Sequence, residues 1–155
     1  MTREDLLATA GKLRQPEPGA AGEFNGKRDL LAERLNRTMS ARPDLERLIG
    51  PENLKMMEDN SRNFMRFMDS MYQGYSPEVL VETVLWVFRA YRAHGFRTTY
   101  WPANLDTCVE ILREELSPDT FRAVCPFYDW LIVNIPVFVK LSEGVLTPPP
   151  GGGHE

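Results

Sequence analysis

Few residues of this chain have the types and spacing that chemistry at a protein site requires. The sequence has two histidines, His94 and His154, and two cysteines, Cys108 and Cys125, and none of them stands in a metal-binding spacing such as Cys-x-x-Cys. No pattern of serines, histidines and acids indicates a catalytic triad, and there is no glycine-rich phosphate loop. We therefore expect a protein that is not an enzyme and two cysteines that are inert thiols.

Five methionines gather in a short segment of the chain, at Met56, Met57, Met65, Met68 and Met71. Methionine is flexible and polarizable, so a cluster of this kind either fills an irregular core or lines a deformable pocket for an apolar ligand. The sequence leaves both interpretations open.

A group of basic residues surrounds His94, namely Arg89, Arg92 and Arg97. These arginines could meet a ligand carboxylate, or they could lie on a solvated helix face. His94 is the one histidine placed where it could bind iron. Alternatively it is a histidine at a helix C-terminus, where it interacts favourably with the helix dipole.

The composition is that of one soluble globular domain, with 155 residues, 43% of them hydrophobic and 26% charged. The net charge of -4 argues against a nucleic-acid-binding protein, which needs a basic face. The longest apolar runs, at 84–88 and 130–133, are too short to span a bilayer, and the N-terminus lacks the pattern of a secretory signal. We expect a cytoplasmic protein with neither nucleic acid nor membrane as a partner.

Prolines mark the starts of the elements that would position these residues. Proline suits the first helical position, and four prolines precede apolar-periodic segments: Pro51, Pro77, Pro102 and Pro118. Ser76 and Ser117 stand directly before two of them as N-caps. The punctuation and the apolar spacing predict helices over 27–40, 51–73, 77–94, 102–115 and 118–142, with a helical turn within 42–50.

Glycines and further prolines modify this scheme. Gly50, Gly74 and Gly95 fall near helix ends, where we expect left-handed caps. Pro126 and Pro136 lie inside the last predicted helix and should bend it.

The two ends of the chain differ from its middle. Thr2 and Asp5 have the spacing of a capping box on a short helix, and residues 15–26 are rich in proline and glycine. We predict an N-terminal helix and linker over 1–26, one helical domain over 27–143 and a disordered tail over 144–155. The fold class is all-α.

The order and spacing of these elements resemble a bacterial globin over residues 28–141. The resemblance is carried by three segments: RLNRTMSARPDLERLIGPENLKMMEDNSRNFMRFM, SPEVLVETVLWVFRAYRAHGFRTTYWPANLDTCVEIL and SPDTFRAVCPFYDWL. It implies a globin-like helical domain, most similar to the non-haem sensor domains of bacterial stress-response regulators.

The resemblance also places the haem-binding positions of a globin on this chain. The proximal position, a histidine in haem globins, falls on Tyr91, with His94 about one turn later. The phenylalanine that wedges the porphyrin corresponds to Ile49, and the distal tyrosine of many bacterial globins corresponds to Leu35. The distal-helix polar position falls on Asn60. The implied pocket is lined by Leu35, Ile49, Met57, Asn60, Phe64, Met68, Val87, Tyr91 and His94.

The resemblance implies a sensory or regulatory domain with an apolar pocket that lacks conventional haem ligation. A small apolar ligand would bind between helices 51–73 and 77–94 and shift the last two helices, through which we expect a homodimer. Two alternatives stay open. One is a haem globin that binds or senses a diatomic gas through His94 or Tyr91, with His94 a metal ligand only in that case. The other is a helical dimerisation or adaptor module without a ligand.

Overall fold

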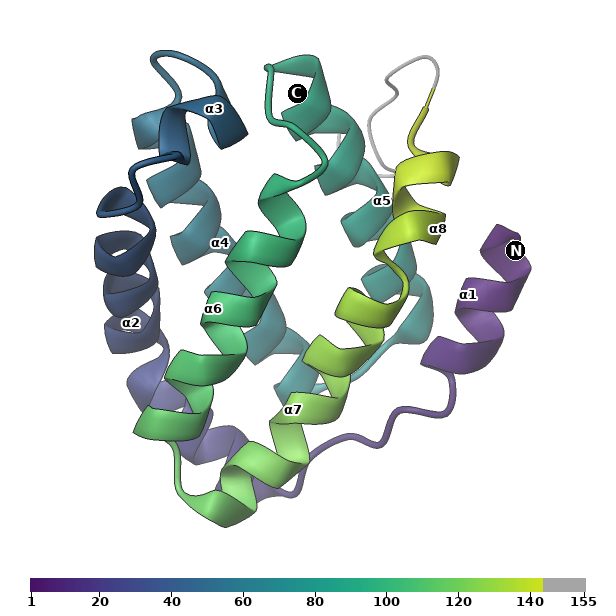
Figure 1. Cartoon of the computed structure of the whole chain (residues 1–155). Coiled ribbons are helices and arrows are strands. Elements are labelled where there is room, and N and C mark those ends of the chain that lie inside the picture. The colour runs from purple at the N-terminus through teal and green to yellow at the C-terminus, as the bar shows by residue number, and fades with distance from the viewer. Residues whose placement is uncertain (144–155) are drawn as a thin grey trace.

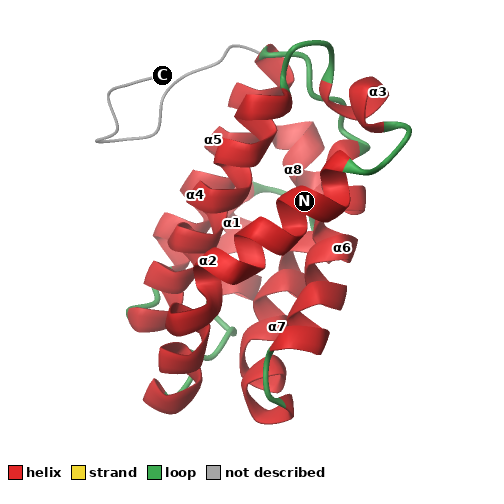
Figure 2. Ribbon diagram, turned by 90° about the vertical axis from the view of Figure 1, so that its left-hand side faces the viewer, coloured by secondary structure: helices red, strands yellow, loops and turns green. Residues whose placement is uncertain are grey.

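The computed structural model describes residues 1–143, and these residues form eight α-helices and no strand (Figures 1 and 2). The helices are α1 (Arg3–Ala10), α2 (Pro18–Ser40), α3 (Leu45–Ile49), α4 (Leu54–Gln73), α5 (Pro77–Ala93), α6 (Tyr100–Glu115), α7 (Pro118–Val133) and α8 (Ile135–Leu141). The all-α prediction is confirmed. The predicted disordered tail, 144–155, lies outside the described residues.

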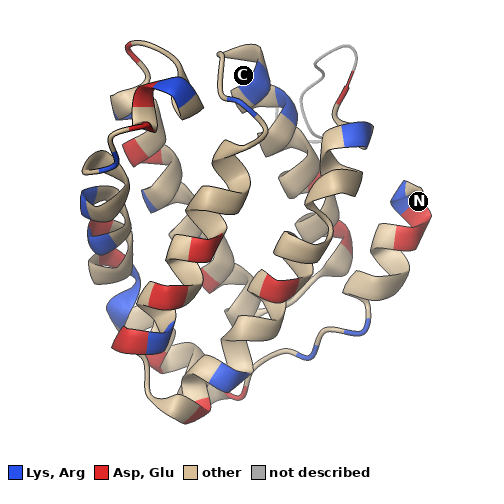
Figure 3. Ribbon diagram, viewed as in Figure 1, with Lys and Arg blue, Asp and Glu red and all other residues tan. Residues whose placement is uncertain are grey.

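The helices pack around one hydrophobic core. Helix α2 lies against α4, α6 and α7, α6 lies against α7, and α5 contacts both α8 and α1. Among the charged residues within 1–143, which Figure 3 colours along the ribbon, only Asp69 of α4 is buried. Its carboxylate accepts hydrogen bonds from Arg28 at 2.5 Å and Asn25 at 2.8 Å, both on α2. This partly buried ion pair therefore links α2 to α4.

The predicted linker over 15–26 is wrong from residue 18 onward, because α2 begins at Pro18. One face of this segment buries Ala21 and Phe24, and the Phe24 ring meets the Tyr72 ring edge to face at a centroid distance of 4.9 Å. This tertiary burial outweighs the poor helix propensity of the glycines in the segment. Helix α1 also belongs to the core, since Leu6 is fully buried.

The serine caps and the capping box are confirmed. Ser76 accepts a hydrogen bond from the Val79 N–H, and Ser117 accepts one from the Thr120 N–H. At the N-terminus of α1, the Thr2 hydroxyl accepts a hydrogen bond from the Asp5 N–H, and the Asp5 carboxylate accepts one from the Thr2 N–H. These two bonds are the predicted capping box.

Two of the three predicted left-handed glycines are confirmed. Gly50 has φ 87° and Gly95 has φ 102°, values that favour glycine. Gly74 instead has φ −162°, so α4 ends in extended backbone and that prediction is wrong. The helix predicted from residue 51 begins at Leu54, because Pro51 and Glu52 lie in a turn.

The last predicted helix divides into α7 and α8 at Asn134, with a bend of 51°. The Asn134 side chain donates a hydrogen bond to the Trp130 carbonyl at 2.9 Å, and Pro136 lies in the first turn of α8, where no helical donor is needed. Pro126 is accommodated inside α7. Among the described residues no single helix is long and apolar enough to cross a membrane. Only the bent pair of α7 and α8 has the length and composition to do so.

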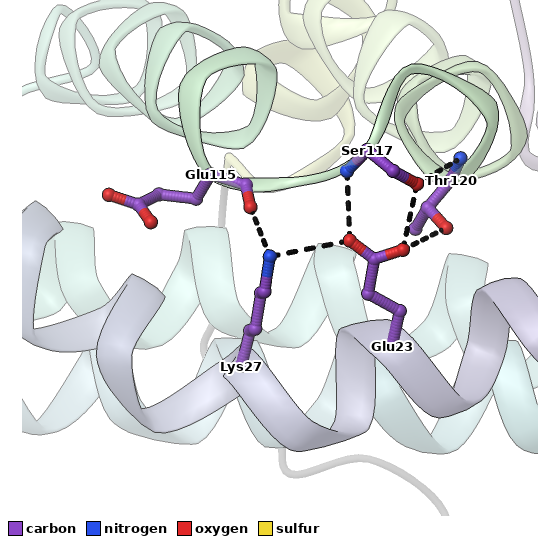
Figure 4. A network of polar contacts seen from close by, with 5 residues as sticks. All are labelled: Glu23, Lys27, Glu115, Ser117 and Thr120. Carbon is purple, nitrogen blue, oxygen red and sulfur yellow. Dashed lines mark hydrogen bonds and ion pairs between the residues drawn. The ribbon is translucent and has the colours of Figure 1, made fainter.

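A carboxylate from α2 caps the N-terminus of α7 (Figure 4). Glu23 accepts hydrogen bonds from the backbone N–H of Ser117 at 2.8 Å, from the Ser117 hydroxyl at 2.8 Å and from the Thr120 hydroxyl at 2.6 Å. Lys27 links the same carboxylate to the Glu115 carbonyl. The Thr120 and Ser117 hydrogen bonds stabilise the charged form and lower the pKa of Glu23 to about 2.

We predict that Glu23→Gln lowers the free energy of unfolding at pH 7 by about 1–2 kcal/mol, because charged acceptors bind these donors more strongly and the site is partly exposed. The lowered pKa means that the difference from wild type is full above about pH 4.5 and shrinks as the pH falls towards about 2. Urea unfolding of both proteins between pH 7 and pH 2.5 measures it.

Glu33→Gln is the matched control, since Glu33 is an exposed residue of α2 whose side chain makes no hydrogen bond or ion pair within residues 1–143. It should behave like wild type throughout. A pH-independent loss in Glu23→Gln would contradict the capping role.

Candidate functional site

An apolar cavity lies where five helices meet. It is lined by Phe64 of α4, by Val84, Val87 and Phe88 of α5, by Trp101, Asn104 and Leu105 of α6, by Leu131 of α7 and by Phe138 of α8. Its volume is about 10 Å³ for the centre of a water-sized sphere, which is room for about one water molecule. None of the lining residues carries a charge.

Aromatic rings from three helices form one wall of this cavity. The Phe88 ring of α5 stacks on the Trp101 indole of α6 at a centroid distance of 4.7 Å and an interplanar angle of 23°. The Phe138 ring of α8 is tilted against Phe88 at 5.3 Å. Such ring pairs stabilise the fold beyond their buried area. The wall therefore also sets where α8 lies on α5.

A neutral polar cluster adjoins the cavity. Asn104 donates a hydrogen bond to the Tyr100 hydroxyl at 3.0 Å, and Asn60 of α4 also hydrogen-bonds that hydroxyl. Burial raises the pKa of Tyr100, so the phenol stays protonated. The cluster can supply hydrogen bonds but no charge.

The structure brings only part of the predicted pocket together. Phe64 and Val87 line the cavity, and Asn60 lies beside it through Tyr100. Four predicted residues are instead buried in the core outside the cavity lining: Leu35, Ile49, Met57 and Met68. The methionine cluster therefore fills the core rather than lining this cavity.

Seven lining residues were missed by the sequence reasoning: Val84, Phe88, Trp101, Asn104, Leu105, Leu131 and Phe138. The spacing of Val84, Val87 and Phe88 places them on one face of α5, which is a usable signal. No local pattern shows that Trp101 and Phe138 meet that face, because they come from different helices.

His94 does not continue the buried face of α5. Helix α5 ends at Ala93, and the left-handed Gly95 turns the chain away, so His94 is exposed at the C-cap. Its carbonyl accepts a hydrogen bond from the Asn53 side chain at 2.8 Å. His94 therefore does not line the cavity described above.

Tyr91 is half-buried, and its ring stands edge-on to the Phe96 ring at 5.0 Å. Burial, and then the negative charge of Asp59, raise the pKa of Tyr91. The neighbouring Arg92 donates hydrogen bonds to the Val139 carbonyl at 2.9 Å and to the Ser142 hydroxyl at 3.0 Å, so it is engaged away from the Tyr91 phenol. Tyr91 is thus a neutral phenol rather than an anionic ligand.

The arginines near the end of α5 hold α8 in place. Besides the contacts of Arg92, Arg89 donates a hydrogen bond to the Leu141 carbonyl at 3.2 Å. These carbonyls belong to the last turn of α8, where cations are favourable. The two guanidinium groups are therefore engaged with the protein rather than placed to meet a ligand carboxylate.

Hydrogen bonds link the turn after α3 to the C-terminal end of α5. Asn53 donates to the Ile49 carbonyl at 2.7 Å as well as to the His94 carbonyl, and the Arg97 N–H donates to the Leu48 carbonyl at 2.8 Å.

The residues present do not fit haem. The cavity holds about one water molecule, Tyr91 is a neutral phenol, and the His94 side chain is exposed to solvent.

Within the described part of the chain, no group of three or more histidine, cysteine, aspartate or glutamate side chains is arranged to hold a metal ion. Comparisons with known proteins identify no relative, since no family model, no curated protein and no solved structure matches the chain.

We predict that ferric haem added to the protein gives no Soret band that depends on His94 or Tyr91, because neither side chain is placed to bind iron in an enclosed site. Absorption spectra of wild type, His94→Ala and Tyr91→Phe should match one another and that of haem alone. A sharp Soret band lost in either variant would overturn this interpretation.

Proposed function

We propose that this chain is a globin-like sensory or regulatory domain that binds a small apolar ligand in the cavity between α4, α5, α6, α7 and α8. The observation that carries the proposal is an uncharged cavity enclosed by side chains from five helices. Protein interiors are close-packed, and an apolar void that remains can bind a small apolar guest. The description as globin-like rests on the sequence resemblance of residues 28–141 to bacterial globins.

The arrangement of α8 supports a regulatory response to such a ligand. Phe138 of α8 is part of the cavity wall, and α8 joins α7 through the bend at Asn134. Because the cavity has room for about one water, a larger guest must displace part of its wall. Helix α8 has only seven residues and is held to α5 by hydrogen bonds from Arg89 and Arg92. A bound guest would therefore shift the balance between two positions of α8.

Xenon tests the cavity, because it is a compact apolar atom that binds in apolar protein cavities. Under xenon pressure we expect NMR shifts at the methyl groups of the lining residues Val84, Val87, Leu105 and Leu131, with smaller shifts at the amides of α8. Val87→Leu adds one methylene to the wall and should abolish them.

Val109→Leu is the matched control, since Val109 lies on α6 outside the cavity lining. It should leave the xenon shifts unchanged. Absent shifts in wild type, or shifts that survive Val87→Leu, would contradict a ligand-binding cavity.

A second candidate function is a dimerisation or adaptor module that uses the last two helices. Val133, at the end of α7, is 74% exposed, the largest exposed fraction among the large hydrophobic residues described. Val133 lies at the bend between α7 and α8, so it would be central to a dimer that uses these two helices.

We predict that Val133→Asp shifts a dimer of this protein to the monomer, measured by sedimentation at several concentrations, because a charge at such a contact is desolvated without a partner. Val79→Asp, at another exposed valine on α5, is the control and should leave the assembly unchanged. A wild-type protein that is monomeric at all concentrations would rule out this second function.

A further inference from the structure

A groove lies on the surface between the segment that connects α1 to α2 and the N-terminal half of α7 (Figure 1). It is lined by residues 12–17 on one side and by Arg122, Ala123 and Pro126 on the other. Its volume for the centre of a water-sized sphere is about 400 Å³, whereas that of the cavity between the helices is about 10 Å³. Ligand sites in proteins have volumes of roughly 300–1,000 Å³. The groove is therefore large enough to hold a short peptide segment.

Hydrogen bonds fix the wall that the connecting segment forms. The Gln15 side chain donates a hydrogen bond to the Gln73 carbonyl at 3.1 Å and accepts one from the Tyr75 N–H at 3.1 Å. At the start of the same segment, the Tyr75 hydroxyl donates a hydrogen bond to the Ala10 carbonyl at 2.6 Å. Pro16 is buried. A wall that is already held in place loses little conformational entropy when a partner binds.

The groove is positively charged, although the whole chain is negatively charged. Its lining contains three cations, Lys12, Arg14 and Arg122, and one anion, Glu17, so its net charge is +2 in a chain of net charge -4. Arg122 forms an exposed ion pair with Asp119. The Lys12 and Arg14 side chains are exposed and make no hydrogen bond or ion pair within residues 1–143. These two cations are therefore free to meet an anionic partner.

The backbone of the connecting segment favours an extended partner. Gln15 and Glu17 each precede a proline, which restricts them to extended backbone, and Glu17 has φ −63° and ψ 156°. The backbone N–H groups of Arg14 and Gln15 make no hydrogen bond within the described residues. An extended peptide can pair with backbone groups of this kind, as in the addition of a β-strand. Leu13 and Pro126 add apolar contacts to the lining.

We propose that this groove binds an extended acidic peptide segment of a partner protein. Its carboxylates meet Lys12 and Arg14, and its apolar side chains lie against Leu13 and Pro126. The charge of the groove decides against a basic segment, since like charges repel. The groove shares no lining residue with the apolar cavity, so this interaction goes beyond the proposed function and does not depend on it.

A matched pair of peptides tests the charge preference. Two hexapeptides, blocked at both ends and labelled with the same fluorophore, alternate either glutamate or glutamine with leucine. Fluorescence anisotropy measures their dissociation constants for the full chain. At low salt we expect the glutamate peptide to bind about 5-fold or more tightly than the glutamine peptide. Added salt should reduce this difference, because it screens exposed charges.

Variants of the two free cations test the position of the site. Lys12→Gln and Arg14→Gln should each weaken binding of the glutamate peptide about 2- to 5-fold and leave the glutamine peptide unaffected. Arg97→Gln is the matched control, because it removes the same charge at an exposed residue outside the groove. It should leave both constants as in wild type. Amide NMR shifts on adding the glutamate peptide should concentrate in residues 12–17 and 122–126.

The outcomes that would overturn the proposal are distinct. The acidic peptide is refuted if both peptides bind equally, if neither binds, or if Arg97→Gln weakens binding as much as Arg14→Gln does. Vesicles of anionic phospholipid that bind wild type but not Arg14→Gln, without binding of either peptide, would make the groove a membrane contact instead. The xenon experiment tests the apolar cavity separately, so the proposed function does not stand or fall with these results.

Discussion

The stack of Phe88 on Trp101 is the contact on which the interior of this protein depends, because it joins α5 to α6 and forms the wall against which α8 packs through Phe138. In a close-packed core, displacing one of these rings requires its neighbours to move as well. The same contact leaves a small apolar space beside the indole and buries the indole N–H without an acceptor. The shape of the cavity and the position of α8 therefore both depend on this stack.

Polar contacts hold the two ends of the bundle, whereas the cavity wall between them is uncharged. At one end, Glu23 of α2 caps α7 and fixes the turn after α6. At the other end, Asn53 clasps the corner after α3 to the end of α5. Hydrogen bonds at these turns satisfy backbone groups that helices leave free. Arg89 and Arg92 of α5 likewise donate hydrogen bonds to carbonyls at the end of α8. These charged groups therefore stabilise the packing of α8 on α5.

The elements that the sequence predicted well are those with strong local signals. Ser76 and Ser117, each followed by proline, marked the starts of α5 and α7 because a cap acts within one turn of its helix. Residues 18–26 were misjudged, since their glycines suggest a linker and only contact with α4 makes them helical. His94 was misplaced because the left-handed Gly95 follows it directly, and the chain leaves the axis of α5 at this point.

Helix positions and the all-α class follow from the chain alone, because capping, proline geometry and apolar spacing act between residues a few positions apart. The candidate site does not. Its wall joins Phe64, Trp101 and Phe138, which belong to three helices and meet only when the core is packed. The resemblance to globins indicated Phe64 and Val87 but not the indole or the ring of α8. Which side chains enclose the cavity, and which donor is left without an acceptor, is decided by the packing of helices far apart along the chain.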